Sequence, residues 1–334
     1  MKKVKTGVAG VGHLGKFHTK LLSEIEVCEL VGVYDLNFDK AKEIAAEFKT
    51  RAFQTMDELL ANVEAVSIAA TTSSHHAIAK ECLEKGVHCF IEKPITATIP
   101  EAEELLSLGA KNNLKIQVGH VERFNPALLA VEKYLSNPLF VQSDRLASFN
   151  PRGSDVAVVL DLMIHDIDII LSLVKSEVSK VDASGIAVVS DSIDIANARI
   201  EFENGAVANV TASRISQKKM RKMRLFQKDA YISVDFNDGT SEIMQLVPHD
   251  TPVDGPYMSF GDMGIGDKKK KIIYQQPEKM QVNALKFELD LFVKAVAANT
   301  RTAVTGEDAL KALKVAEMII NKIDISVNKI MNRF

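Results

Sequence analysis

Tryptophan is absent from this 334-residue sequence, and cysteine is scarce, with three residues. Cys28, Cys82 and Cys89 stand among apolar neighbours and show neither CxxC nor Cys/His spacing. This pattern argues against both a disulfide framework and a zinc site. It predicts buried thiols in a reducing, cytoplasmic compartment.

Long apolar runs and an excess of either charge are also missing. No uninterrupted apolar segment approaches the roughly 20 residues that a membrane-spanning helix needs, and the glycine-rich N-terminus lacks the apolar core of a signal peptide. Lysine and arginine number 41 against 44 acidic residues, a formal charge of -3, so there is no strongly basic field for nucleic acid. We therefore expect neither a membrane nor a nucleic-acid partner.

The composition present is that of a globular enzyme, with 46% apolar and 25% charged residues, and the length favours two domains. Over residues 1–120, short apolar runs alternate with helical patterns, which predicts a Rossmann domain with a doubly wound parallel sheet. The predicted strands are Lys5 to Ala9, Leu30 to Tyr34, Ala65 to Ala69, His88 to Ile91 and Lys115 to Val118. The predicted helices are Leu14 to Ser23, Asp39 to Phe48, His75 to Lys85 and Pro100 to Asn112.

Residues 121–334 follow a different rhythm, which predicts a second α/β domain for substrate binding and oligomerisation. Alternating strands separated by Asn-Gly and Asp-Gly turns from Val178 to Val247 indicate a large, mostly antiparallel sheet. The segment from His249 to Lys279 is predicted to be a long surface loop, either a solvated excursion or a lid or subunit contact. The predicted helices are Asn125 to Leu135, Val156 to Val174, Gln281 to Ala298 and Glu307 to Lys322, the last opening with a capping box of Thr305 and Asp308.

A glycine motif follows the first predicted strand and opens the first predicted helix. In Gly10-Val-Gly12-His-Leu-Gly15, the first glycine permits a tight turn, the second lets a pyrophosphate approach the backbone, and the third lets helix and strand pack closely. We count the whole loop, including His13 and Leu14, as cofactor-binding, without a chemical role for the imidazoles of His13 and His18.

An acid at the end of the second predicted strand completes the dinucleotide fingerprint. Asp35 stands twenty residues after Gly15, where a carboxylate accepts hydrogen bonds from the adenosine ribose diol. The same acid repels a 2′-phosphate, and Leu36 and Asn37 offer no guanidinium to bind one. We predict NAD as the cofactor in preference to NADP. NADP is the less favoured alternative, because Lys40 is a nearby cation that could attract its 2′-phosphate.

Glu92-Lys93-Pro94 comes just past a predicted strand, at the carboxyl edge where open α/β sheets bind ligands. The proline restricts the backbone of Lys93 and can take the cis form, so it can fix where the ammonium points. Lys93 could bind a substrate hydroxyl or stabilise a developing alkoxide. The alternative is a surface lysine beside a proline turn.

Asp161 and His165 are spaced four residues apart on a predicted helix with apolar neighbours, so both project from one face. A neutral imidazole held by a carboxylate is a candidate general base. Asp168 could orient the ring or cap a neighbouring element. The alternatives are a satisfied core histidine or, less favoured, a metal site, and we predict no metal because no further ligand cluster accompanies them.

Three further groups of residues leave functional and structural interpretations open. Within Gly119 to Pro126, Arg123 and Asn125 could line a substrate cleft or form a helix-entry network with Asn125 as N-cap. Thr71, Ser73 and His75 are candidate cofactor contacts together with Glu92 and Lys93, although Ser73 and Ser74 resemble a helix N-cap and His75 could be structural. The basic stretch from Lys218 to Arg224 is either a solvated face or an anion-binding wall.

Taken together, GxGxxG, Glu92-Lys93-Pro94 and Asp161-x-x-x-His165-x-x-Asp168 resemble the glucose-fructose oxidoreductase, inositol dehydrogenase and MocA family of NAD(P)-dependent oxidoreductases. The likeness extends to Gly306-Glu307-Asp308-Ala309-Leu310. It implies a Rossmann domain followed by an α/β domain whose open sheet face is buried in a homodimer or homotetramer. It also implies that Lys93, Asp161 and His165 are catalytic and that Pro94 follows a cis bond. Ala70-Thr71 departs from the Thr-Pro that is frequent in the family.

The stretch Gly119 to Pro126 is similar to family members that act on nucleotide-linked amino sugars, the UDP-N-acetylglucosamine 3-dehydrogenases. This resemblance implies a nucleotide-sugar substrate, with His165, oriented by Asp161, taking the hydroxyl proton in a crevice shared with Lys93 and the nicotinamide. The alternatives are oxidation of inositol, a free sugar or another small molecule, and a non-catalytic dinucleotide sensor.

Overall fold

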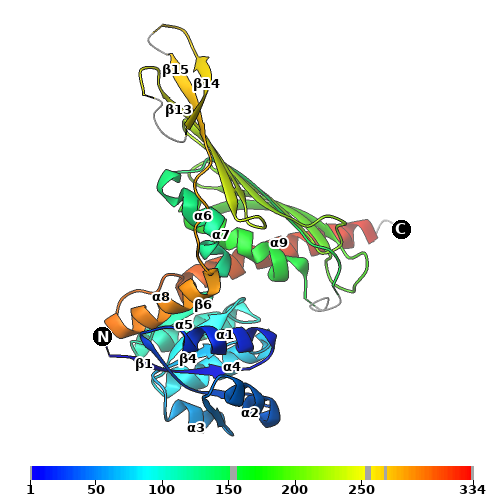
Figure 1. Ribbon diagram of the computed structural model, residues 1–334. Coiled ribbons are helices and arrows are strands. Elements are labelled where there is room, and N and C mark those ends of the chain that lie inside the picture. Colours follow the sequence, from blue (N-terminus) through cyan, green and yellow to red (C-terminus); the bar gives the residue numbers. More distant parts are fainter. Residues whose placement is uncertain (1, 151–155, 253–256, 267–268, 332–334) are drawn as a thin grey trace. The chain divides into compact units, whose positions relative to one another are not determined.

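The computed structural model describes residues 2–150, 156–252, 257–266 and 269–331 (Figure 1). The chain forms two compact units, Met1–Phe124 with Asn283–Leu313, and Asn125–Val282 with Lys314–Phe334. The C-terminal segment Asn283–Leu313 thus packs with the N-terminal part of the chain. The predicted domains, residues 1–120 and 121–334, are each continuous in sequence and do not include this return of the chain.

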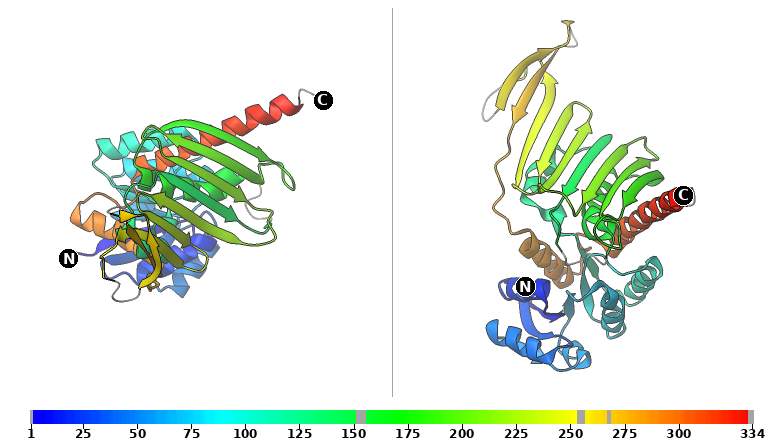
Figure 2. Two further views of the ribbon diagram at one scale, coloured as in Figure 1. Left: turned by 90° about the horizontal axis from the view of Figure 1, so that it is seen from above. Right: turned by 90° about the vertical axis from the view of Figure 1, so that its right-hand side faces the viewer.

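A six-stranded parallel sheet with the order β3-β2-β1-β4-β5-β6 forms the centre of the first unit (Figure 2). The reversal of strand order at β1 is that of a doubly wound sheet, and it confirms the predicted Rossmann fold. The strands are β1 (Val4–Ala9), β2 (Cys28–Tyr34), β3 (Arg51–Phe53), β4 (Ala65–Ile68), β5 (His88–Glu92) and β6 (Ile116–Gly119). The helices are α1 (His13–Ser23), α2 (Phe38–Glu47), α3 (Met56–Leu60), α4 (Thr72–Glu84), α5 (Ile99–Lys111), the 3-10 turn η1 (Val121–Phe124) and α8 (Ala284–Ala298).

Among the elements of this unit that the sequence did not predict are the three-residue strand β3 and the five-residue helix α3. Both are too short for a periodic pattern of apolar residues to appear. The local signal for α3 is its N-cap, because Thr55 accepts a hydrogen bond from the backbone N–H of Glu58 at 3.2 Å.

Helix α8 completes the core of the first unit, although it lies far along the chain from the sheet. Its buried residues Leu289, Phe292 and Val293 belong to the same apolar cluster as side chains of β1, α1 and β5. The rings of Phe90 and Phe292 meet edge to face at 5.7 Å. This burial explains why the segment after residue 282 returns to the first unit.

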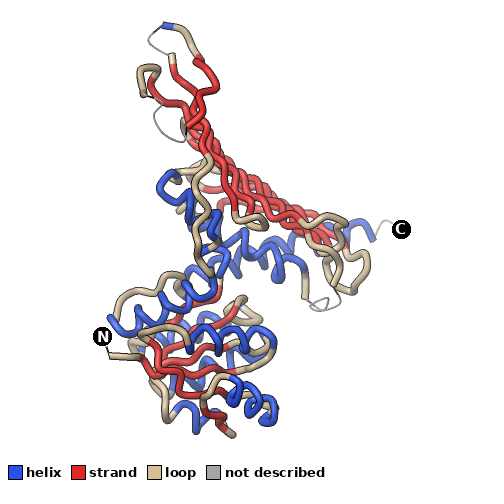
Figure 3. Tube along the Cα trace, in the orientation of Figure 1, coloured by secondary structure: helices blue, strands red, loops and turns tan. Residues whose placement is uncertain are grey.

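The second unit is built on a nine-stranded sheet with the order β14-β15-β13-β12-β11-β7-β10-β9-β8. All neighbouring strands pair antiparallel except β10 and β7, which confirms the predicted mostly antiparallel sheet. Figure 3 shows helices along one face of this sheet. The strands are β7 (Phe140–Leu146), β8 (Val178–Ile186), β9 (Ile195–Phe202), β10 (Val207–Ser213), β11 (Met220–Gln227), β12 (Ala230–Asp235), β13 (Thr240–Pro248), β14 (Tyr257–Met263) and β15 (Lys270–Gln275).

The prediction of a long surface loop from His249 to Lys279 is wrong. Strands β14 and β15 pair antiparallel with each other, and β15 extends the sheet beyond β13. Strand β14 is at the sheet edge and is exposed along almost its whole length. It therefore lacks the alternation of buried and exposed positions by which a strand is recognised in sequence.

The helices of the second unit are α6 (Pro126–Val131), the 3-10 turn η2 (Glu132–Tyr134), the π-helix η3 (Val159–Met163) and α7 (Ile164–Val174). The last helix, α9 (Gly306–Met331), begins in the first unit and ends in the second. Its predicted capping box is confirmed, because the N–H of Asp308 donates to Thr305 Oγ1 and the N–H of Thr305 donates to Asp308 Oδ2, both at 3.2 Å.

The three cysteines are buried and unpaired, as predicted. Among the described residues, no helix combines the length and the hydropathy needed to cross a bilayer. The same part of the chain contains no group of three or more His, Cys, Asp or Glu side chains placed to hold a metal ion.

Candidate functional site

The glycine loop between β1 and α1 has the shape that its sequence requires. Gly10 has φ +85°, and a Cβ added there would lie 2.7 Å from the backbone nitrogen of Ala70. A Cβ at Gly15 would lie 1.8 Å from the carbonyl oxygen of Gly10. Side chains are therefore sterically excluded at both positions, and the loop stays close to β4.

The outer side of the same loop is open. A Cβ added at Gly12 would meet no described atom nearer than Lys40 Nζ, at 4.0 Å. Gly12 is the N-cap of α1, and no side chain caps the helix. The first N–H groups of α1, at His13 and Leu14, therefore face an open space at the positive end of the helix dipole, which fits a pyrophosphate.

Asp35 is held beside this loop by two backbone hydrogen bonds. Its Oδ2 accepts from the N–H of Val11 at 2.8 Å, and its Oδ1 accepts from the N–H of Asn37 at 2.9 Å. The carboxylate is only partly buried, so it can also accept from a ribose hydroxyl. The Lys40 ammonium near Gly12 makes no ion pair with a described acid.

These two charges predict how the protein discriminates between dinucleotides. The wild-type protein should bind NAD at least ~10-fold more tightly than NADP, because Asp35 repels a 2′-phosphate. Substituting Lys40→Ala should weaken NADP binding more than NAD binding, because NADP carries the additional 2′-phosphate. Calorimetric titration of both proteins with both dinucleotides measures this, and equal affinities of the wild type would contradict the role of Asp35.

The Lys93 turn directly follows β5, and its peptide bond to Pro94 is cis, as the family resemblance implied. His75 is buried, with Nδ1 at 2.9 Å from the carbonyl oxygen of Pro94 and Nε2 at 3.2 Å from that of Ala70. The imidazole thus joins the turn after β4 to the turn that carries Lys93. This is a structural role, and a cofactor contact by His75 stays a prediction.

The predicted N-cap at Ser73 and Ser74 is wrong by two residues. Helix α4 starts at Thr72, with Thr71 at the N-cap position and no capping side chain. Ser73 and Ser74 lie in the first helical turn, where their hydroxyls are 3.4 and 3.2 Å from Thr71 Oγ1. A run of four adjacent hydroxyl residues, from Thr71 to Ser74, made the first turn resemble a cap.

Asp161 and His165 lie in two different kinds of helix. Asp161 is in the π-helix η3, and His165 is in the first turn of α7, which follows directly, so the predicted helix is present but is not α-helical throughout. The wider π turn changes the spacing along the helix face. Both side chains are partly exposed, whereas Asp168 is buried. The orientation of His165 by Asp161 stays a prediction.

A buried ion pair that the sequence analysis did not identify holds α7 against the sheet. Arg145 on β7 donates from Nε and Nη2 to the two carboxylate oxygens of Asp166, at 2.8 and 3.0 Å. Both side chains are at most 3% exposed. Since Asp166 is next to His165, this bidentate pair fixes the start of the helix that carries His165.

A second buried cluster holds the segment before η3. Asp194 accepts hydrogen bonds from the backbone N–H groups of three residues, Val188, Val189 and Ser190. It also forms an ion pair with Arg214. The guanidinium of Arg214 donates in turn to the carbonyl of Val156. Burial alone would raise the pKa of Asp194, but these hydrogen bonds outweigh it and hold that pKa well below its usual range. The charged carboxylate therefore anchors the chain just ahead of Asp161.

Arg123 and Asn125 take part in structural contacts at helix starts. Arg123 Nη1 lies 3.6 Å from Asp308 Oδ2 at the start of α9. Asn125 is the N-cap of α6, with its Oδ1 accepting from the N–H of Ala127 at 3.0 Å and its Nδ2 donating to the carbonyl of Phe236 at 3.1 Å. The helix-entry interpretation of Asn125 is confirmed, and substrate contacts by both residues stay a prediction.

The basic stretch Lys218 to Arg224 lies largely exposed at the start of β11. Two of its cations pair with acids on neighbouring strands: Lys222 with Asp235 at 3.0 Å, and Arg224 with Asp144 at 3.7 Å. Such cross-strand pairs favour the interpretation of a solvated face over an anion-binding wall.

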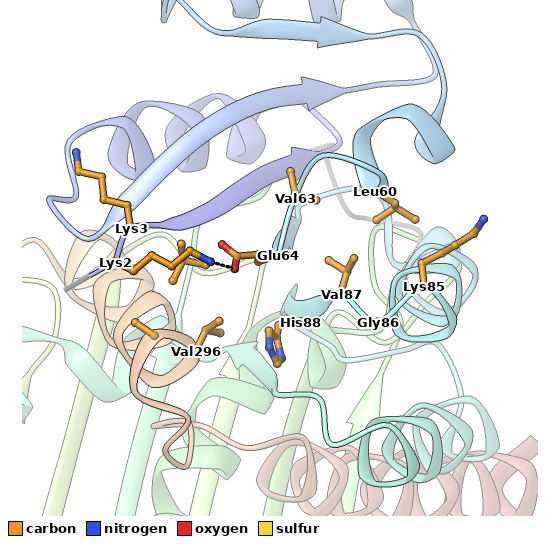
Figure 4. A pocket seen from close by; sticks show the side chains of 12 residues that line it. Lys2, Lys3, Leu60, Val63, Glu64, Lys85, Gly86, Val87, His88 and Val296 are labelled. Carbon is orange, nitrogen blue, oxygen red and sulfur yellow. Dashed lines mark hydrogen bonds and ion pairs between the residues drawn. The ribbon is translucent and has the colours of Figure 1, made fainter.

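The first unit contains a pocket of about 460 Å³ (Figure 4). It is lined by the Lys2–Glu64 ion pair, by His88 and by aliphatic side chains. Val4 and His88 are the first residues of β1 and β5, so the pocket is at the amino edge of the sheet. The glycine loop and Lys93 follow the carboxyl edge, where ligands of such sheets bind.

Two family models match the chain. The model described as "Oxidoreductase family, NAD-binding Rossmann fold" matches residues 4–120, and a C-terminal domain model of the same family matches residues 139–239. UDP-N-acetylglucosamine 3-dehydrogenase from Acidithiobacillus ferrooxidans is 38% identical over 317 residues, which cover 95% of this chain and 96% of the relative.

Solved structures and a second relative extend the comparison. The structure of that Acidithiobacillus ferrooxidans enzyme has a TM-score of 0.86 at 36% identity and covers 97% of this chain and 99% of its own. Myo-inositol 2-dehydrogenase from Thermotoga maritima is 23% identical, with 93% of each chain covered. The similarity therefore spans both units, including the segments that contain Lys93 and His165.

Proposed function

Since the chain belongs to the glucose-fructose oxidoreductase, inositol dehydrogenase and MocA family of NAD-binding oxidoreductases, we propose that it oxidises the 3-hydroxyl of UDP-N-acetylglucosamine to a ketone. This proposal depends on the similarity, over almost the whole of both chains, to the UDP-N-acetylglucosamine 3-dehydrogenase of Acidithiobacillus ferrooxidans. The open glycine loop and the fixed Asp35 carboxylate support NAD as the dinucleotide.

The proposed mechanism gives the cofactor, His165 and Lys93 one role each. NAD, when bound, supplies the acceptor for the hydride that leaves the sugar carbon. His165 takes the hydroxyl proton as general base, with its ring oriented by Asp161. The Lys93 ammonium stabilises the negative charge that develops on the oxygen as the ketone forms.

The proposal is tested by incubating the protein with NAD and a panel of nucleotide sugars, inositols and free sugars. We expect NADH absorbance to rise with UDP-N-acetylglucosamine, and mass spectrometry to show a product that has lost two hydrogens. Faster oxidation of an inositol would favour the function of the more distant relatives. Tight NAD binding without turnover on any substrate would favour a dinucleotide sensor.

We also propose that the protein acts in the cytoplasm and forms a homodimer or homotetramer. Three buried, unpaired thiols are consistent with a reducing compartment. The strand register aligns a row of apolar side chains across the second sheet, and the four that are most exposed are between 37% and 56% accessible. The row consists of Met258, Tyr274, Met244, Tyr231, Phe226, Phe140 and Val207.

The centre of this row is an aromatic cluster, with ring centroids of Phe140 and Phe226 5.7 Å apart and those of Phe226 and Tyr231 5.0 Å apart. A contiguous apolar row on a sheet face is typical of a surface buried in an oligomer. The proposed partner is therefore a second copy of this chain, with the rows facing each other.

The substitution Phe226→Lys should break this assembly, because two lysines would be desolvated at a self-complementary interface. Light scattering coupled to gel filtration should show at least a twofold fall in mass relative to the wild type. Lys228→Glu, an exposed change just beyond the same strand, should leave the mass unaltered. A monomeric wild type would contradict the proposal.

A further inference from the structure

A chain of buried polar groups crosses the first unit beneath the Lys93 turn. His18 on α1 lies between two partners: its Nδ1 is 2.7 Å from Ser67 Oγ on β4, and its Nε2 is 2.9 Å from Glu92 Oε1 at the end of β5. The side chains of His18 and Ser67 are fully buried, and that of Glu92 is 12% exposed. The three groups therefore link the glycine-loop helix to the residue before Lys93.

The Glu92 carboxylate is confined on three sides. Its Oε2 accepts from the backbone N–H of Lys93 at 3.3 Å. A Cβ added at Gly119 on β6 would lie between 2.9 and 3.1 Å from the carboxyl atoms, so the absence of a side chain at Gly119 makes room for them. With His18 on the remaining side, the carboxylate is held in one position.

This carboxylate keeps its charge next to a candidate catalytic ammonium. Burial alone would raise the pKa of Glu92, but the contact with His18 and the positive charge of Lys93 outweigh it and lower that pKa. Buried charged groups destabilise a fold unless they are well paired, and apolar residues of similar size would lower the free energy of unfolding less at these positions. A charged carboxylate in this place therefore indicates a role beyond stability.

We propose that His18 and Glu92 are positioning residues for Lys93. His18 fixes the Glu92 carboxylate, and the carboxylate in turn fixes the backbone of Lys93 and places a negative charge beside the Lys93 turn. The inference rests on the role of Lys93 in the proposed function, and it assigns His18 a part in the reaction without contact with substrate or cofactor.

The test compares Glu92→Gln and His18→Asn with a matched pair of controls. The exposed pair His76 and Glu104, joined at 2.8 Å in the same unit, provides His76→Asn and Glu104→Gln. We expect the first two variants to lower kcat about tenfold, with KM and the NAD dissociation constant within about twofold. The double variant should lose little more than Glu92→Gln alone, since the residues act as one unit. The controls should match the wild type.

A second measurement needs neither substrate nor cofactor. Limited acetylation of the cofactor-free protein near neutral pH, followed by peptide mass spectrometry, reports how readily the reagent reaches and modifies the Lys93 amine. Glu92→Gln should raise the acetylation rate of Lys93 about threefold or more relative to Lys80 in the same sample, because the carboxylate no longer holds the Lys93 turn in one position.

The outcomes separate this inference from the proposed function. Unchanged acetylation of Lys93 together with unchanged kcat in both variants overturns the positioning role. A loss confined to NAD affinity or KM also overturns it, since it would show a role in binding. Raised acetylation of Lys93 in a protein that does not oxidise UDP-N-acetylglucosamine supports the positioning role and contradicts the proposed substrate.

Discussion

Replacing Lys93 by methionine is expected to lower turnover of UDP-N-acetylglucosamine about 100-fold or more, with the NAD dissociation constant within about twofold of the wild type. Methionine keeps an unbranched apolar chain but removes the ammonium that stabilises charge on the substrate oxygen. Initial rates from NADH absorbance, together with calorimetric titration of NAD, measure both quantities.

Two further variants make this result specific. His165→Ala should cause a loss of similar size, because the proposed general base is removed. Lys85→Met changes an exposed lysine that pairs with Asp57 at the amino edge of the same sheet, and it should retain the wild-type rate. A near-full rate for Lys93→Met or His165→Ala, with NAD affinity unaltered, would remove that residue from the mechanism.

The largest expected effect on stability comes from the buried pair beside His165. Asp166→Ala should lower the free energy of unfolding of the second unit by about 3–5 kcal/mol, because it leaves the Arg145 guanidinium buried and unpaired by this carboxylate. Tyrosine fluorescence during denaturation is a suitable probe, since the chain lacks tryptophan and Tyr134, Tyr231, Tyr257 and Tyr274 all belong to this unit.

The double variant Arg145→Met with Asp166→Leu is the matched control. Replacing both partners by apolar residues of similar size should recover most of the lost stability, because the variant has neither charge of this buried pair. If Asp166→Ala costs less than ~1 kcal/mol, or if the double variant is no more stable than the single one, the pair does not anchor α7 as inferred.

Much of the first unit could be predicted because its signals are local. The order of strand, glycines, helix and acid predicts the nucleotide-binding loop, and Gly10 and Gly15 each avoid one close contact, such as that between Gly15 and the carbonyl of Gly10. The capping box could be predicted for the same reason, because its two partners, Thr305 and Asp308, lie within four positions of each other in the sequence.

What could not be predicted depends on residues far apart in the chain. Arg145 and Asp166 look like ordinary surface charges until the fold brings β7 and α7 together, and Asp194 meets Arg214 in the same way. His18 had no assigned role because its partners come from β4 and β5. The π-helix around Asp161 has no distinct periodicity in sequence, and strand β14 is exposed on both faces.

The packing of α8 against the first unit has a consequence for how the chain is made. Residues 1–124 emerge from the ribosome long before Leu289, Phe292 and Val293 are synthesised. These three residues of α8 cover apolar side chains of β1, α1 and β5. Until α8 is synthesised, these apolar side chains remain uncovered. The N-terminal part of the first unit therefore leaves the ribosome with part of its core exposed to water and to other nascent chains. The need for chaperones should therefore be greatest before α8 is synthesised.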